Sequence, residues 1–125
     1  MDTDVVLDIE REYEMLSTAG KKAWDNMMED FNEVSKKLGL SRKEKQAMKQ
    51  RYMADLRYND LAITNKYLSR TGEEFSQKQI KKNKLEMQRM SWVYQNHEVL
   101  VMDIEQKVSQ EMEQKRQERK DTQKR

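Results

Sequence analysis

The chain of 125 residues contains no cysteine and no proline, and it has only three glycines. Without cysteine it can form no disulfide framework, no thiolate nucleophile and no cysteine-based zinc site. Without proline, and with so little glycine, few positions oblige a helix to stop. Glu, Lys, Gln, Arg, Met and Leu, which all favour helices, are abundant instead. The sequence therefore predicts an all-α protein.

Long apolar runs are also missing. The mean hydropathy is −1.20, and charged residues make up 38% of the chain. No stretch approaches the roughly 20 apolar residues that cross a bilayer. The acidic N-terminus lacks the apolar core of a signal peptide. We expect a soluble, cytoplasmic protein that does not act at a membrane.

Features of catalytic and cofactor sites are scarce. The chain has a single histidine, His97, and no glycine-rich phosphate loop. No Glu stands three residues before His97, so the Glu-x-x-His pattern of helical di-iron sites is absent. His97 is either a packed residue of a helical seam or a pH-sensitive element within it. We expect no enzyme, no cofactor, no metal and no small-molecule substrate.

The three glycines, Gly20, Gly39 and Gly72, fall where the apolar pattern breaks, and glycine is common just past a helix end. They divide the chain into four expected helices, over residues 3–17, 21–38, 42–70 and 74–113. We predict that the first two form a short N-terminal helical pair and that the last two form a long antiparallel hairpin, similar to a coiled coil. Residues 1–113 form one domain, and residues 114–125 are expected to be a charged, fraying tail.

The expected last helix carries two apolar stripes. One repeats every seven residues, at Ile80, Met87, Tyr94, Val101 and Val108. Such a repeat is typical of a helix that packs along its length against another. The second stripe lies on a different face and consists of Leu85, Trp92, Val99 and Met102. One neighbouring helix cannot cover both faces. The second stripe therefore predicts a protein interface, in a non-enzymatic assembly protein that self-associates or binds a protein partner.

The net charge of +2 conceals an asymmetry. Residues 1–35 hold ten acids and three bases, so the rest of the chain carries an excess of bases. Either the two parts neutralise each other, within the fold or between subunits, or the basic part meets a polyanion. Bases are densest between residues 36 and 51, where seven face a single acid: Lys36, Lys37, Arg42, Lys43, Lys45, Lys49 and Arg51.

Residues 34–51 also fit a helix-turn-helix motif in part. Gly39 stands at the turn, and Ser41 with Glu44 forms a capping box that opens the second helix. However, Lys45 stands where such a motif turns an apolar side chain inward, and the second helix continues well beyond a usual recognition helix. One interpretation is a helix end with a solvated basic face. The alternative is a nucleic-acid-binding regulator or DNA-packaging type of factor that uses the seven bases.

Overall fold

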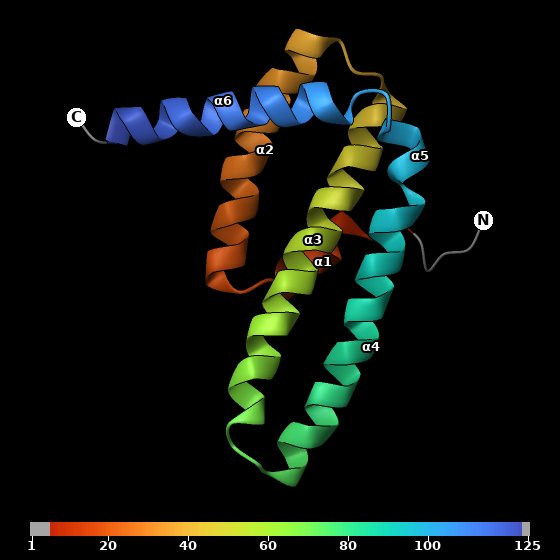
Figure 1. The fold of residues 1–125 in the computed structure, drawn as a ribbon, viewed down its shortest axis with the longest axis vertical. Coiled ribbons are helices and arrows are strands. Elements are labelled where there is room, and N and C mark those ends of the chain that lie inside the picture. The colour runs from red at the N-terminus through yellow and green to blue at the C-terminus, as the bar shows by residue number, and fades with distance from the viewer. Residues whose placement is uncertain (1–5, 124–125) are drawn as a thin grey trace.

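The structure, a computed structural model, describes residues 6–123, which fold into six helices (Figure 1). The helices are α1 (Ile9–Met15), α2 (Thr18–Leu38), α3 (Arg42–Ser69), α4 (Glu74–Asn96), α5 (Glu98–Val101) and α6 (Glu105–Gln123). Residues 6–123 contain no strand, so the all-α prediction is confirmed. In this part of the chain, no helix combines the length and the apolar character that a membrane crossing requires.

α3 and α4 form the predicted antiparallel hairpin, the longest feature of the molecule (Figure 1). The predicted capping box opens α3: the Ser41 hydroxyl accepts from the Glu44 N–H at 3.1 Å, and the Glu44 carboxylate accepts from the Ser41 N–H at 2.8 Å. Gly72 makes the turn between the two helices with a φ of 66°, in the left-handed region that favours glycine.

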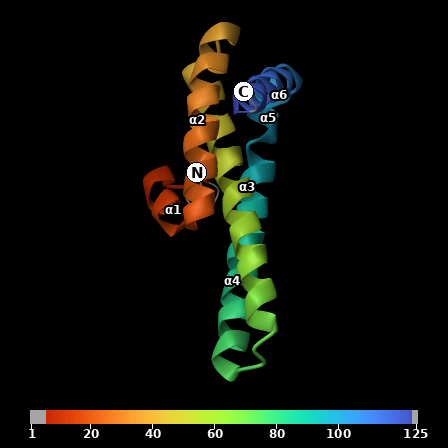
Figure 2. The same cartoon turned by 90° about the vertical axis from the view of Figure 1, so that its left-hand side faces the viewer.

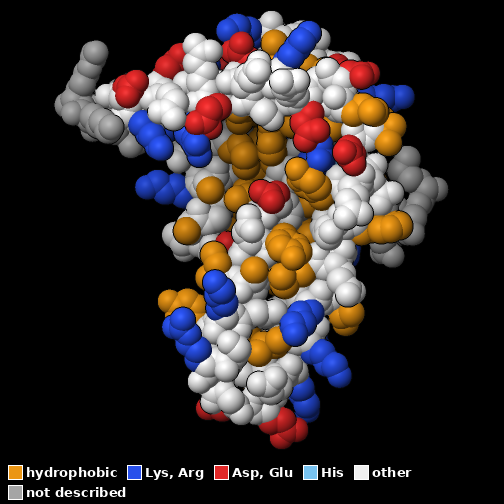
Figure 3. All heavy atoms as spheres, in the orientation of Figure 1, with side chains coloured by type: hydrophobic (Ala, Val, Ile, Leu, Met, Phe, Trp, Pro, Cys, Tyr) orange, Lys and Arg blue, Asp and Glu red, His pale blue; other side chains and the backbone are white. Residues whose placement is uncertain are grey.

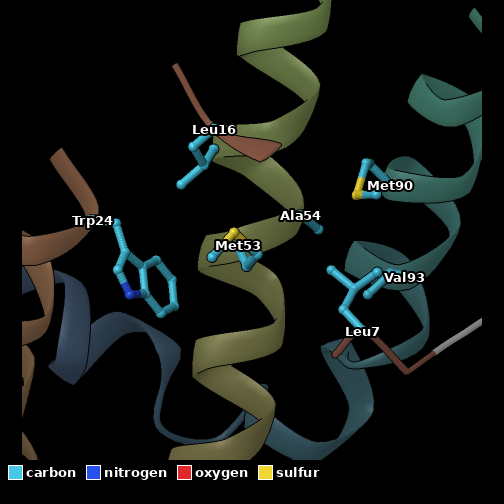
Figure 4. Close-up of a cluster of buried hydrophobic side chains, with 7 residues drawn as sticks. All are labelled: Leu7, Leu16, Trp24, Met53, Ala54, Met90 and Val93. Carbon is cyan, nitrogen blue, oxygen red and sulfur yellow. The ribbon is translucent and has the colours of Figure 1, made fainter. Parts of the chain in front are cut away.

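The core consists of two adjoining clusters along α3. In the first, side chains from the N-terminal segment and α2 meet the hairpin, as Figure 4 shows for Leu7, Leu16, Trp24, Met53, Ala54, Met90 and Val93. In the second, α2, α3, α5 and α6 contribute Phe31, Val34, Ala47, Met48, Val101 and Val108. Both clusters lie in the half of the hairpin away from its turn, because α1 and α2 cover only that half.

α1 and α2 each pack on α3, so the N-terminal pair is held together mainly through that helix (Figure 2). α1 is shorter than the predicted helix 3–17, whose residues 3–5 lie outside the described residues. The Gln50 side chain accepts from the Leu7 N–H at 2.7 Å and donates to the Leu7 carbonyl at 2.8 Å. These bonds anchor Leu7 to α3, and α1 begins only after Asp8, whose backbone is extended and whose side chain caps the helix.

Gly20 does not end a helix as predicted. α2 begins at Thr18, with Ser17 as its N-cap, so Gly20 lies in the first turn. Its role is a close approach to α3: a Cβ placed on Gly20 would lie 2.8 Å from Asp60 Oδ2. The same carboxylate accepts from the Ser17 N–H at 2.7 Å and from the Ser17 hydroxyl at 3.0 Å. Glycine therefore allows α2 to begin directly against α3.

The predicted continuous helix 74–113 is wrong, because the chain is interrupted twice. At His97, the ring Nδ1 lies 2.8 Å from the Val93 carbonyl oxygen. In a regular helix that oxygen would accept from the backbone N–H of residue 97. That N–H bonds to the Gln95 carbonyl instead. The second break follows Val101, where residues 102–104 form a turn and α6 leaves to cross α2 (Figure 1).

The predicted fraying tail is also wrong for the residues that the structure describes, because α6 remains helical to Gln123. Its basic side chains meet the acids of α2. Lys115 Nζ lies 2.6 Å from Glu33 Oε2, and an Arg119 guanidinium nitrogen lies 2.7 Å from Asp30 Oδ1. The acidic and basic parts of the chain thus neutralise each other within one fold at this crossing.

Candidate interaction surfaces

The second apolar stripe lies on the side of α4 and α5 that faces away from α3. Its four side chains keep large exposed fractions: Leu85 65%, Trp92 53%, Val99 75% and Met102 64%. On the opposite side of α4, Met90 and Val93 are fully buried. Because the hairpin already occupies the inner face, none of its packing requires the outer four side chains to be apolar.

The stripe continues across the break at His97. The backbone there stays in the right-handed helical region (φ −96°, ψ −1°), and α5 stacks on the end of α4 (Figure 1). Val99 therefore extends the outward row that Leu85 and Trp92 begin. The packing of α4 against α3 keeps this row on the outside of the hairpin, which suits a docking face.

The basic segment divides into groups with different surroundings. Lys36, Arg42, Lys45 and Lys49 line a hollow of about 350 Å³ at the turn between α2 and α3. The other described residues that line it are Asn32, Ser35 and Gln46, and none of its lining residues is acidic. This hollow can hold an anion, since four positive side chains converge on it without a carboxylate.

Two of the seven predicted bases are engaged within the fold, and one lies elsewhere. Lys37 Nζ pairs with Glu111 Oε2 at 2.8 Å. Arg51 is buried: it pairs with Glu105 Oε1 at 3.0 Å, and its guanidinium lies 4.0 Å above the Tyr94 ring. Lys43 faces a second hollow, on another side of α3. Arg51 therefore does not belong to the exposed basic surface.

That second hollow, of about 760 Å³, lies between the N-terminal segment, α3 and the junction of α4 with α5. Its lining is mainly apolar, with His97 at one side and Lys43 and Lys49 at another. Because a carbonyl can only accept, the bond to Val93 places a proton on Nδ1 of His97. His97 thus acts in the described structure as a packed residue of the seam that also ends α4.

Two apolar surfaces were not predicted. At the turn end of the hairpin, Ile63, Tyr67 and Phe75 are exposed, because α1 and α2 do not reach that far. Beneath α6, in the angle between α2 and α3, Figure 3 shows hydrophobic side chains around a hollow of about 360 Å³. The second surface depends on where α6 crosses α2, and no repeat in the sequence indicates where that crossing lies.

Among the described residues, no three His, Asp or Glu side chains gather closely enough to hold a metal ion. No protein-family model matches this chain, and no curated protein or solved structure matches it either. The outer stripe and the basic hollow are the features of the described residues that bear on function.

Proposed function

We propose that this chain is a non-enzymatic assembly protein that self-associates through the outer face of α4 and α5. One observation carries the proposal: four large apolar side chains are exposed on the outer side of α4 and α5, namely Leu85, Trp92 and Val99 at seven-residue spacing and Met102 just after α5. Rows of this kind on soluble proteins usually mark interaction sites. Trp92 lies between the others, and a central Trp is a common energetic anchor of protein interfaces.

The mass of the protein in solution tests the proposal. At tens of micromolar we expect sedimentation equilibrium to give at least twice the 15.2 kDa subunit mass. Trp92→Asp removes the anchor and adds a charge, so it should weaken association by roughly 30-fold or more, which corresponds to the loss of about 2 kcal/mol. Tyr67→Asp makes a matched change at an exposed aromatic on the other helix of the hairpin, and it should leave the mass unchanged.

Circular dichroism should show the same helix content for both variants, since neither position is buried. A wild-type protein that stays at the subunit mass across this range contradicts the proposal. Equal masses for the two variants would place the contact elsewhere.

A second function is favoured by the hollow at the turn between α2 and α3. Lys36, Arg42, Lys45 and Lys49 converge there without an acid, which is the arrangement expected for contact with a phosphate backbone. As the alternative, we propose nucleic-acid binding at this hollow, in a regulator or packaging factor.

Anisotropy of a labelled DNA duplex, measured at several salt concentrations, tests this alternative. We expect binding at low salt whose affinity falls steeply as salt rises, because counterions are released from the DNA. Replacing Lys36, Arg42 and Lys45 with Gln should abolish it. Replacing Lys78, Lys81 and Lys82 with Gln removes the same charge at the far end of the hairpin and should preserve it. Equal loss in both variants, or no binding by the parent, excludes the hollow as a nucleic-acid site.

A further inference from the structure

The apolar row on α4 and α5 is symmetric about Trp92. Leu85 stands seven residues before Trp92, and Val99 stands seven residues after it. At 1.5 Å per residue, Leu85 lies about 10 Å from Trp92 along α4, and Val99 lies on its other side, on α5. Seven residues are close to two helical turns, so Leu85 and Trp92 share one face of α4, and Val99 is exposed on α5, beyond the break at His97. The apolar spacing is therefore the same in both directions from Trp92, so the row alone does not distinguish a parallel from an antiparallel partner.

The charges beside the row are not symmetric, because the two ends carry opposite signs. Near the hairpin turn, exposed lysines precede Leu85: Lys78, Lys81, Lys82 and Lys84. Only Lys78 has an ion-pair partner among the described residues, Glu74 at 4.0 Å. At the other end, Glu98 and Asp103 are exposed and form no ion pair with the described residues. Lys81 stands eleven residues before Trp92 on α4, and Asp103 stands eleven residues after it, in the turn that follows α5.

These two patterns together select one way for two copies to meet. A parallel arrangement would place the lysines of both copies side by side, and likewise their acids, and such contacts are repulsive. An antiparallel arrangement about Trp92 instead brings Leu85 toward Val99 of the second copy, and brings the lysine end, with Lys81, toward the acidic end of the second copy, with Asp103. The same contacts then occur twice, as in an isologous interface.

We infer that the occupant of the outer face is a second copy of this chain, bound antiparallel, with the twofold axis passing beside Trp92. The inference rests on the proposed self-association and adds its geometry. The two Trp92 side chains meet at the axis, where the interface excludes water best, and the opposite charges lie at its rim. Charges at a rim chiefly select the correct partner and orientation.

A charge exchange tests this arrangement. Lys81→Asp creates two contacts between like charges in the antiparallel dimer, so its dissociation constant should rise at least tenfold. Asp103→Lys should do the same. The double variant restores opposite charges at both contacts, and its dissociation constant should return to within about threefold of wild type. Lys66→Asp, at an exposed lysine on α3, is the control and should change nothing.

Failure of the geometry and failure of self-association give different results. If wild type sediments as a dimer that Trp92→Asp dissociates, but the double variant stays as weak as the single ones, the antiparallel arrangement is overturned and self-association stands. If wild type does not dimerise, both are overturned.

Cross-linking gives an independent test, because the chain has no cysteine of its own. Gln88 and Asn96 stand one turn on either side of Trp92 and are exposed. In the antiparallel dimer, residue 88 faces residue 96 of the second copy, while two residues 88 are about 12 Å apart along the axis. That separation exceeds the reach of a disulfide.

Mixing Gln88→Cys with isotopically labelled Asn96→Cys under mild oxidation should therefore give at least fivefold more mixed disulfide than either same-residue product. A parallel dimer would give mainly the same-residue products, and that result would overturn the inference.

Discussion

Two arginines of α3 are buried, and each holds a distant segment against the hairpin. Arg57 pairs with Glu12 of α1 at 3.1 Å, and both side chains are about 95% covered. Arg51 pairs with Glu105 at the start of α6. Buried ion pairs contribute little net stability, but a lone buried charge is costly. The two pairs join the start of α6 and α1 to α3.

The first prediction concerns Arg57. Replacing Arg57 with Leu leaves the Glu12 carboxylate buried, with Arg89 as its remaining partner at 4.0 Å. We expect the free energy of unfolding in urea to fall by roughly 3–5 kcal/mol. Replacing Glu12 and Arg57 together with Leu should recover most of the lost stability, because no buried charge is then left without a partner. A double variant that is less stable than Arg57→Leu would show that the pair itself holds α1 in place.

At the scale of elements, α6 is the least expected part of the fold. Its basic side chains bond to carboxylates on α2, and these contacts are only partly covered. The Lys115 ammonium, through its bond to the carboxylate, lowers the pKa of Glu33 below its ordinary value of 4.5. The same bond raises the pKa of Lys115 above its ordinary 10.5. Docking of α6 should therefore depend on pH and on salt.

The second prediction follows from the sign of these shifts. The Glu33 contribution is fully present above about pH 4.5 and is lost as pH falls through the lowered pKa. The Lys115 contribution is present below about pH 10.5 and is lost as pH rises through the raised pKa. α6 should therefore dock best between these limits.

The distance between nitroxides at Asn32→Cys and Gln117→Cys should accordingly be narrow at pH 7 and broad at pH 3. Lys115→Gln should weaken that response, and helix content from circular dichroism separates undocking from global unfolding. The same distance distribution at pH 3 and pH 7 would show that the apolar contacts under α6 hold it alone.

At the scale of the whole molecule, the sequence predicted the architecture better than its interruptions. The absence of proline, the seven-residue repeat and Gly72 were sufficient for an all-α chain with a long hairpin. The break at His97 depends on a bond from its side chain to one carbonyl. Glycine is required at position 20 because Asp60, on another helix, leaves no room for a Cβ. Neither contact, one local and one between helices, leaves a periodic pattern in the sequence.

The candidate sites were predictable to a similar extent. The outer stripe could be found because a hairpin needs only one face of α4. Arg51 was included with the exposed bases, although it stands four residues after Ala47 and three before Ala54, on a buried stripe. That spacing was the available signal that its side chain points inward. For the hollow beneath α6, the sequence contains no comparable spacing of apolar residues that would predict it.

We propose separate roles for the two faces of α4, the inner face in folding and the outer face in association. A thermal melt at several protein concentrations tests this claim most directly, because only a protein that unfolds from an associated state has a concentration-dependent midpoint. We predict that the wild-type midpoint rises from micromolar to hundreds of micromolar protein, and that the midpoint of Trp92→Ala does not change over that range. A wild-type midpoint that is independent of concentration would contradict the claim.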